Sequence, residues 1–74
     1  MALVRDVRER FGQRIRDLRH AGRLSQEELA HRAGIHPTYV GGIERGERNP
    51  ALINIARLAK ALGVTLAELF EDLK

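Results

Sequence analysis

The chain has 74 residues, a formal net charge of +3 at neutral pH and no cysteine. This length supports one domain with one small core, and the lack of cysteine excludes a disulfide framework and a cysteine-based zinc site. Its 43% hydrophobic and 31% charged residues fit a globular protein, and no apolar run approaches the roughly 20 residues of a membrane span. We therefore expect a cytoplasmic protein.

The charge is unevenly distributed along the chain. Residues 1–24 carry seven Arg against three acidic residues, whereas residues 63–74 carry one Lys against three acidic residues. Such a gradient fits a basic end that faces a polyanion and an opposite end turned away from it. By itself the gradient identifies no ligand.

Start and stop signals divide the chain into five predicted helices. Each of the first four apolar stripes is followed by a glycine that is expected to end a helix in the left-handed conformation, namely Gly22, Gly34, Gly46 and Gly63. Two starts are capping boxes, Ser25 with Glu28 and Thr65 with Glu68, and two are residue–proline pairs, His36-Pro37 and Asn49-Pro50. The predicted helices cover residues 4–21, 25–33, 37–45, 50–62 and 66–73.

Apolar residues recur at helical spacing in each of these segments. In chain order the stripes are Val4, Val7, Phe11, Ile15 and Leu18; Leu29, Ala30 and Ala33; Val40 and Ile43; Leu52, Ile55, Leu58 or Ala59, and Leu62; and Leu66, Leu69, Phe70 and Leu73. No segment alternates with the period of two that marks a strand. The predicted fold is all-α, a compact five-helix orthogonal bundle in which residues 1–74 form a single domain.

Only three residues, Gly34-Ile35-His36, separate the second and third predicted helices. Two short helices joined this tightly, with glycine in the turn, form a helix-turn-helix, here at about residues 25–45. Val40 and Ile43 would fasten the third helix to the core. The outer side of that helix would then carry Pro37, Thr38, Gly41, Gly42 and Arg45.

The motif resembles a known family. LSQEELAHRAGIHPTYVGGIERGERNP, followed by LAKALGV, is similar to the phage-repressor and Cro-type helix-turn-helix (XRE-like) DNA-binding proteins over residues 11–71. Within that family, TYVGGIERGERNP most resembles the small controller proteins of restriction-modification systems. The resemblance implies a sequence-specific transcriptional regulator of double-stranded DNA that works at the nucleoid. It also implies that the third helix lies in the major groove, which is about 12 Å wide.

By position on that helix, the resemblance assigns base contacts to its outer and N-terminal residues: Pro37, Thr38, Tyr39, Gly41 and Gly42. The two glycines are unusual, because each costs a helix roughly 0.8–1 kcal/mol relative to alanine. We expect that they let the helix approach the bases without obstruction. The alternative is that one of them is needed where the first helix crosses closely.

Phosphate contacts are assigned, on the same resemblance, to five residues around the motif: Ser25, Gln26, Arg45, Arg48 and Asn49. The start of a helix binds anions through its free N–H groups and its dipole. Simple helix capping is an equally good role for Ser25. Arg45 suits a phosphate better than a guanine, since most protein–DNA hydrogen bonds go to the backbone.

An acidic residue, Glu44, lies within the IERG segment. In the family this carboxylate is structural and pairs with an arginine of the first helix, which corresponds to Arg19 here. We expect this ion pair, and not acid catalysis, because a buried carboxylate near DNA needs such a partner. The first helix also carries Arg5, Arg8 and Arg10, which either reach the DNA backbone at the flank of the site or only solubilise the helix.

Family members commonly bind a palindromic operator as homodimers. A chain of this length leaves the contact to the last two helices, where Ile53 lies off the main apolar stripe. The predicted interface consists of Ile53, Leu66, Leu69, Phe70 and Leu73. The alternative is that all of these except Ile53 close the core.

Other classes of function lack support in the residue pattern. His20, His31 and His36 fall on three elements without ligand spacing, so we expect no metal site. Nothing indicates a catalytic site, a cofactor, a small-molecule ligand or membrane binding. The remaining alternatives are an antitoxin or other protein-interaction module that reuses this fold, and the detached DNA-binding half of a larger regulator.

Overall fold

The computed structural model describes residues 2–71 and 73, except for the side chains of residues 2, 4 and 5. Its five helices are α1 (Ala2–Ala21), α2 (Gln26–Ala33), α3 (Pro37–Glu44), α4 (Leu52–Leu62) and α5 (Leu66–Leu69), and no strand occurs among the described residues. The predicted all-α, five-helix fold is therefore confirmed. The core role predicted for Val4 and the flanking role considered for Arg5 fall outside the described side chains.

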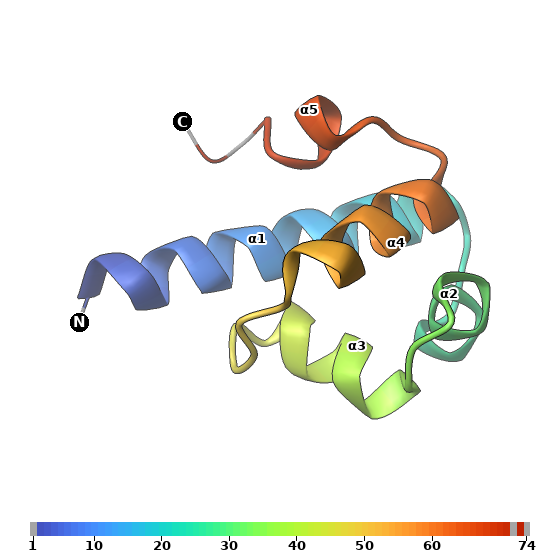
Figure 1. The fold of residues 1–74 in the computed structure, drawn as a ribbon, viewed down its shortest axis with the longest axis horizontal. Coiled ribbons are helices and arrows are strands. Elements are labelled where there is room, and N and C mark those ends of the chain that lie inside the picture. The colour runs from blue at the N-terminus through green and yellow to red at the C-terminus, as the bar shows by residue number, and fades with distance from the viewer. Residues whose placement is uncertain (1, 72, 74) are drawn as a thin grey trace.

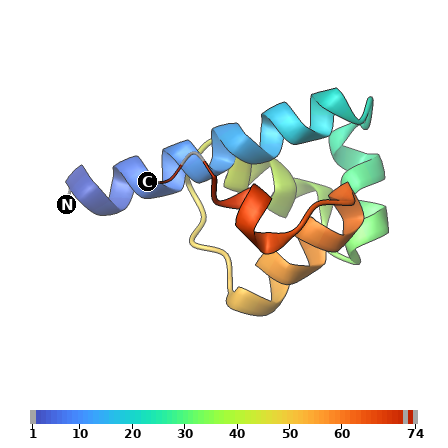
Figure 2. The same ribbon diagram turned by 90° about the horizontal axis from the view of Figure 1, so that it is seen from above.

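α1 and α4 form the middle of the bundle, as Figure 1 shows. α3 lies on one side of α1 and α4, and α5 lies on the other side. α1 is the longest helix, and its front half extends beyond the bundle in both views (Figures 1 and 2). The C-terminal segment turns back from α5 toward this extending half (Figure 2).

A single core joins all five helices. Its buried apolar residues are Phe11, Ile15, Leu24, Leu29, Ala30, Ala33, Val40, Ile43, Leu58, Ala59 and Leu69. α1 crosses the C-terminal end of α3 very closely at Gly12, where an added methyl carbon would lie 2.2 Å from the Ile43 carbonyl oxygen. The glycine required by this crossing is thus Gly12, on α1. Neither Gly41 nor Gly42 is needed for the close crossing of α1, so this alternative explanation for the α3 glycines does not apply.

Three predicted helix boundaries are off by two residues or more, and the first is the start of α1, at Ala2 instead of residue 4. α4 begins at Leu52, with Ala51 as its N-cap in an extended conformation, so the Asn49-Pro50 pair belongs to the preceding loop. α5 ends at Leu69, and the Glu68 carbonyl in its last turn accepts two hydrogen bonds from Arg14, of 3.1 and 2.7 Å, and one of 3.3 Å from the Glu71 N–H.

The stop predicted at Gly22 is displaced by one residue. Arg23 takes the left-handed conformation instead, with φ of 58°, and the Leu24 N–H closes the end of α1 on the Arg19 carbonyl. The other three glycine stops are confirmed, since Gly34, Gly46 and Gly63 all have positive φ. Both predicted capping boxes are present.

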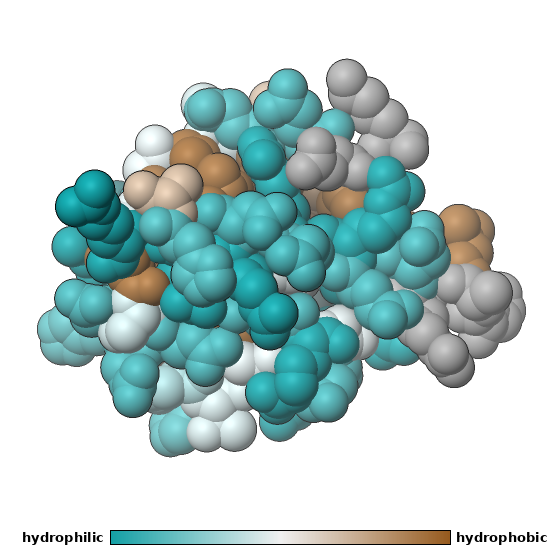
Figure 3. All heavy atoms as spheres, turned by 180° about the vertical axis from the view of Figure 1, so that it is seen from behind, coloured by the Kyte–Doolittle hydropathy of each residue, from teal (hydrophilic) through white to brown (hydrophobic). Residues whose placement is uncertain are grey.

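In the predicted apolar stripes of α1 and α4, two residues are exposed. Leu52 is 76% exposed because it occupies the first position of α4, whose later residues turn toward the core. Val7 is 45% exposed because it lies on the extending half of α1. The back of the molecule is mostly hydrophilic, with hydrophobic atoms in small separate areas (Figure 3). No helix in the described part of the chain has the length and apolar character needed to span a membrane.

Candidate nucleic-acid interface

The turn between α2 and α3 sets the direction of α3. Gly34 ends α2 with φ of 71°, and the Ile35 N–H bonds back to the Ala30 carbonyl at 3.0 Å. His36 then caps α3, because its Nδ1 accepts a hydrogen bond of 3.0 Å from the Thr38 N–H. Pro37 occupies the first turn, where a missing N–H has no cost. This turn leaves Thr38 exposed at the start of α3.

The outer side of α3 carries Gly41 and Gly42, but neither glycine is exposed. A methyl carbon on Gly42 would lie 2.8 Å from Arg48 Cγ, and one on Gly41 would lie 3.1 Å from Arg45 Nη1 and 3.5 Å from Gln26 Oε1. The prediction that the glycines form a bare surface for the bases is therefore wrong in the free protein. They leave room for polar side chains to lie flat against the helix.

The Arg48 side chain covers the outer side of α3 at Gly42. Its guanidinium lies 5.8 Å from the centre of the Tyr39 ring, in a cation–π contact, and its aliphatic stem crosses Gly42. Arg45 is exposed and pairs with Glu47 at 3.1 Å, a surface ion pair that is readily exchanged. Both arginines thus lie over α3, and neither forms an ion pair with a buried carboxylate in the described part of the chain.

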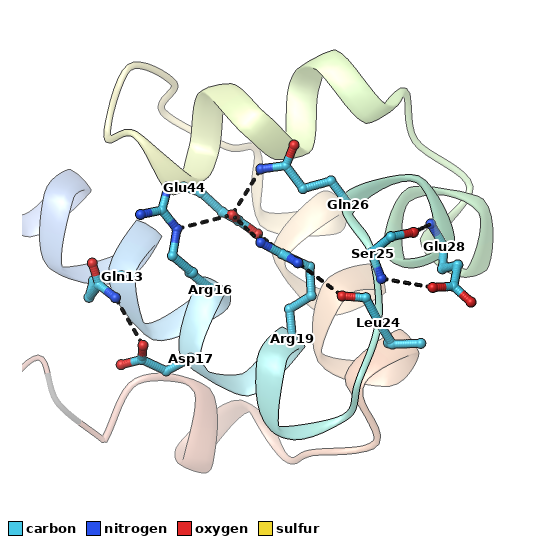
Figure 4. A network of polar contacts seen from close by, with 9 residues as sticks. All are labelled: Gln13, Arg16, Asp17, Arg19, Leu24, Ser25, Gln26, Glu28 and Glu44. Atoms are coloured by element: carbon cyan, nitrogen blue, oxygen red, sulfur yellow. Dashed lines mark hydrogen bonds and ion pairs between the residues drawn. The ribbon is translucent and has the colours of Figure 1, made fainter.

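A buried carboxylate joins three helices beside this surface (Figure 4). The Glu44 side chain is fully buried and accepts two hydrogen bonds from Arg19, of 2.7 and 3.0 Å. Gln26 donates a third, of 3.0 Å, and Arg16 a weaker fourth, of 3.4 Å. Arg19 also donates to the Leu24 carbonyl at 2.9 Å, which ties the end of α1 to the same network.

The network fixes the charge state of the pair. Burial alone would raise the pKa of Glu44, but the hydrogen bonds from Arg19 and Gln26 outweigh it and hold this pKa below its usual range. The hydrogen bond from the Arg19 guanidinium to Glu44 raises the pKa of Arg19. Glu44 is therefore an anion at neutral pH, and its charge is compensated within the protein.

The predicted phosphate-contacting residues fall into two groups. Ser25 and Gln26 lie at the start of α2, where the Ser25 hydroxyl accepts from the Glu28 N–H at 3.0 Å and Gln26 is held by Glu44. Arg48 and Asn49 are exposed in the loop after α3. The two groups flank α3, together with Arg45 at its end.

Arg16 was not predicted to belong to the Glu44 network. It lies three residues before Arg19, so both arginines share the face of α1 that meets α3. That spacing was visible in the sequence. The closeness of the crossing at Gly12, which brings Arg16 within reach of Glu44, was not.

The predicted dimer residues do not form one exposed set. Ile53, Leu66 and Phe70 are 61%, 45% and 38% exposed, and Leu73 is partly buried against the core. Leu69 is fully buried, so its assignment to the interface is wrong. It is the residue through which α5 enters the core.

The described residues show no grouping of His, Asp and Glu that would hold a metal ion. What the fold does present is a short helix on a tight turn, with donor side chains on both flanks. These features define a helix-turn-helix protein.

Comparison with known proteins agrees with this class. A helix-turn-helix family model matches residues 15–69. Control protein C.MunI of Mycoplasma sp is 39% identical over 72 residues, covering 96% of this chain and 97% of that protein. Control protein C.BamHI of Bacillus amyloliquefaciens is 41% identical, covering 93% of this chain and 86% of that protein. The crystal structure of the restriction-modification controller C.AhdI from Aeromonas hydrophila superposes with a TM-score of 0.84 at 54% identity, over 88% of this chain and 97% of that one.

The chain therefore belongs to the helix-turn-helix family of transcriptional regulators. The resemblance inferred from its sequence is confirmed, including the similarity to controller proteins.

Proposed function

We propose that this chain is a controller of a restriction-modification system that binds a palindromic operator as a homodimer, with α3 in the major groove. The observation that carries the proposal is the glycine-faced outer side of α3, over which Gln26, Arg45 and Arg48 converge. Similarity to control proteins along nearly the whole chain supports the regulatory role. The proposal includes no catalytic step and no cofactor.

The donors over α3 suit a polyanion at close range. Arginine contacts phosphates and guanine edges through a planar set of N–H donors. Arg45 pairs with an exposed carboxylate and Arg48 lies over the partly buried Tyr39 ring, so rotation of either toward DNA breaks no buried ion pair among the described residues. Once these side chains have moved, Gly41 and Gly42 leave the backbone of α3 free to approach the bases. We therefore keep both glycines, with Pro37, Thr38 and Tyr39, as proposed base contacts.

The start of α2 would contact the phosphate backbone on the other flank. The backbone N–H groups of Gln26 and Glu27 lie in the first turn of this helix, where the dipole favours an anion. Gln26 is positioned by Glu44, so the buried network would set the contact geometry. Ser25 and Asn49 complete the proposed backbone contacts.

A homodimer would place two α3 helices in successive major grooves. Half-sites lie about one helical turn apart, ~34 Å. The two α3 helices of the dimer, related by a two-fold axis, must have the same spacing. Ile53, Leu66 and Phe70 supply exposed apolar surface on α4 and at α5, and Leu73 borders it. These four residues form the proposed interface.

Gel-shift titration tests the DNA proposal, with the duplex upstream of the chain's own gene and a scrambled duplex. We expect a salt-sensitive, sequence-selective shift at nanomolar to micromolar protein. Arg48→Ala should weaken binding, while Arg57→Ala, a matched charge change on exposed α4 surface, should leave it near the parent value. Equal loss in both variants, or no selective shift, would favour a protein-interaction module.

The glycines can be tested separately from the arginine. A methyl group in Gly42→Ala would displace the Arg48 stem, whose nearest atom is 2.8 Å away. If Gly42 acts only by seating Arg48, the variant combining Gly42→Ala with Arg48→Ala should bind as Arg48→Ala alone does. If Gly42 also allows close approach to the bases, the combined variant should bind more weakly, with its helical circular dichroism unchanged.

A further inference from the structure

An exposed carboxylate, that of Glu47, lies at the end of α3 beside the surface proposed to meet DNA. Its side chain is 61% exposed and pairs with the Arg45 Nε at 3.1 Å. The backbone holds Glu47 at this place, because Gly46 turns the chain with φ of 77° and the Glu47 N–H donates to the Gly42 carbonyl at 2.9 Å. An acidic side chain so close to a polyanion weakens binding by repulsion, so its presence calls for an explanation.

The Arg45 side chain lies along the outer side of α3. Arg45 keeps helical backbone angles at the end of the helix, with φ of −84° and ψ of −3°. A long side chain in this conformation points back toward the residue four positions earlier, which is Gly41. A methyl carbon on Gly41 would lie 3.1 Å from Arg45 Nη1. The absence of a side chain at Gly41 therefore gives the guanidinium its room on the helix.

The carboxylate occupies only one edge of the guanidinium. Glu47 pairs with Nε, and in the described part of the chain neither Nη1 nor Nη2 of Arg45 makes a hydrogen bond. Arginine recognises a planar pair of acceptors through two parallel N–H groups. The two terminal nitrogens form such a pair of donors, and they lie over the side of α3 that would face the bases.

We propose that Arg45 contacts a guanine in the major groove and that Glu47 is the positioning residue that orients it. Nη1 and Nη2 donate to O6 and N7 of the guanine, the acceptor pair that arginine contacts most often in specific complexes. Glu47 keeps the Nε edge. A phosphate contact would gain nothing from this arrangement, because a carboxylate beside the arginine repels the phosphate.

The ion pair gains importance when DNA binds. A pair this exposed contributes little to the stability of the free protein. The duplex removes water from around it, and the attraction between Arg45 and Glu47 grows as the local dielectric constant falls. An arginine that is already oriented also loses less freedom on binding. Repulsion between Glu47 and phosphates acts at every duplex, whereas the guanine contact offsets it only at the correct sequence. Glu47 should therefore lower non-specific affinity and raise discrimination.

This inference rests on the proposed placement of α3 in the major groove and changes two assignments within it. Arg45 contacts a base, whereas the sequence alone favoured a phosphate. Gly41 supports the side chain that contacts the base, so its own contact with the bases passes through Arg45. Arg48 keeps its proposed contact with the DNA backbone.

Selection of duplexes from a random pool identifies the guanine. The parent should enrich a sequence that contains, in each half-site, a G·C pair for which Arg45→Ala has no preference, while both proteins share the other enriched positions. Replacing this G·C pair by A·T should weaken the parent by about 5–150-fold. The same replacement should leave the affinity of Arg45→Ala nearly unchanged, because this variant lacks the donors that the guanine accepts.

Glu47→Gln separates orientation of the arginine from a simple effect of charge. This variant keeps the shape of the side chain and removes its charge, so it should bind a scrambled duplex more tightly than the parent does. It should also lose much of the preference for G·C over A·T at the identified pair. Asp17→Asn makes the same charge change on exposed α1 surface, where Asp17 accepts from Gln13 at 2.9 Å (Figure 4). This control should keep the full preference.

Three outcomes decide between the assignments. If Arg45→Ala weakens binding to all duplexes equally and keeps the G·C preference, Arg45 contacts phosphate and the inference is overturned. A Glu47→Gln variant with the preference of the parent would overturn the positioning role. A parent that enriches no sequence at all would instead overturn the proposed DNA-binding function. Melting temperatures near that of the parent are expected for both variants, because the pair is exposed.

Discussion

Replacing Glu44 by Gln removes one negative charge where α1, α2 and α3 meet and keeps the shape of the side chain. The parent carboxylate is fully buried and accepts from Arg19 at 2.7 and 3.0 Å, while the Arg19 side chain is only 10% exposed. The variant leaves Arg19 as an uncompensated, largely buried charge and presents an amide to the Gln26 donor. Breaking a buried pair in this way costs about 3–5 kcal/mol, a large part of the 5–15 kcal/mol typical of a domain.

Thermal unfolding at a fixed protein concentration measures the effect. For a domain of this size, about 3 kcal/mol lowers the melting temperature by at least roughly 12 °C. Asp6→Asn is the control, because the exposed Asp6–Arg10 pair spans 3.7 Å and contributes at most about 1 kcal/mol. A melting temperature for Glu44→Gln as close to the parent as that of Asp6→Asn would refute a stabilising role for the network.

The difference in stability between the parent and Glu44→Gln should also change with pH, in a direction that the pKa of Glu44 sets. The folded-state pKa of Glu44 lies below its unfolded value, so its contribution is complete above the unfolded value, about 4.3. That contribution falls as the pH drops through the folded-state pKa. The gap in stability between parent and Glu44→Gln should therefore be constant from pH 7 to about 5 and shrink in more acidic solution. A gap that widens on acidification would contradict the assignment.

Three further substitutions test other parts of the fold. Gly12→Ala should lower the melting temperature strongly, because its methyl group would lie 2.2 Å from the Ile43 carbonyl oxygen at the α1–α3 crossing; overpacking costs about 1–3 kcal/mol or more, and an unchanged value would show that the crossing can widen. His36→Ala should destabilise α3 by about 1 kcal/mol through loss of the N-cap to Thr38, and His36→Asn, which restores an acceptor, should recover most of it in denaturant titrations. Thr65→Ala removes the α5 cap, so we expect a loss of about 1 kcal/mol and faster hydrogen exchange at Leu69, whereas unchanged exchange would show that core packing alone holds α5.

Local sequence signals were sufficient to predict most of the helix starts and stops. Ser25 with Glu28 and Thr65 with Glu68 mark helix starts by side chains three residues apart, and Gly34 and Gly63 mark stops by a φ that other residues avoid. These signals act within one turn of backbone. The tight turn between α2 and α3, and hence the class of motif, follows from them without any long-range contact.

Other errors involve contacts between segments that are distant in the chain. Arg14 of α1 bonds the Glu68 carbonyl at the end of α5, and burial of Leu69 removes it from the proposed interface. The side chains of Arg48, Arg45 and Gln26 cover glycines that the helix pattern alone places outside. Of these covering residues only Gln26 lies on another helix; Arg45 and Arg48 closely follow the glycines in the chain, and the helix pattern does not give the direction of their side chains.

The sequence by itself determined the five helices, the turn that makes the motif, and the family resemblance, because capping, glycine stops and apolar periodicity are local properties of the chain. Only the tertiary structure decided which side chains cover α3, that Arg16 joins the Glu44 network, and that Glu47 pairs with one edge of the Arg45 guanidinium. Those features depend on how closely the helices pack and on the direction in which long side chains lie across them. Periodicity gives the face of a helix, whereas packing distance decides what that face meets.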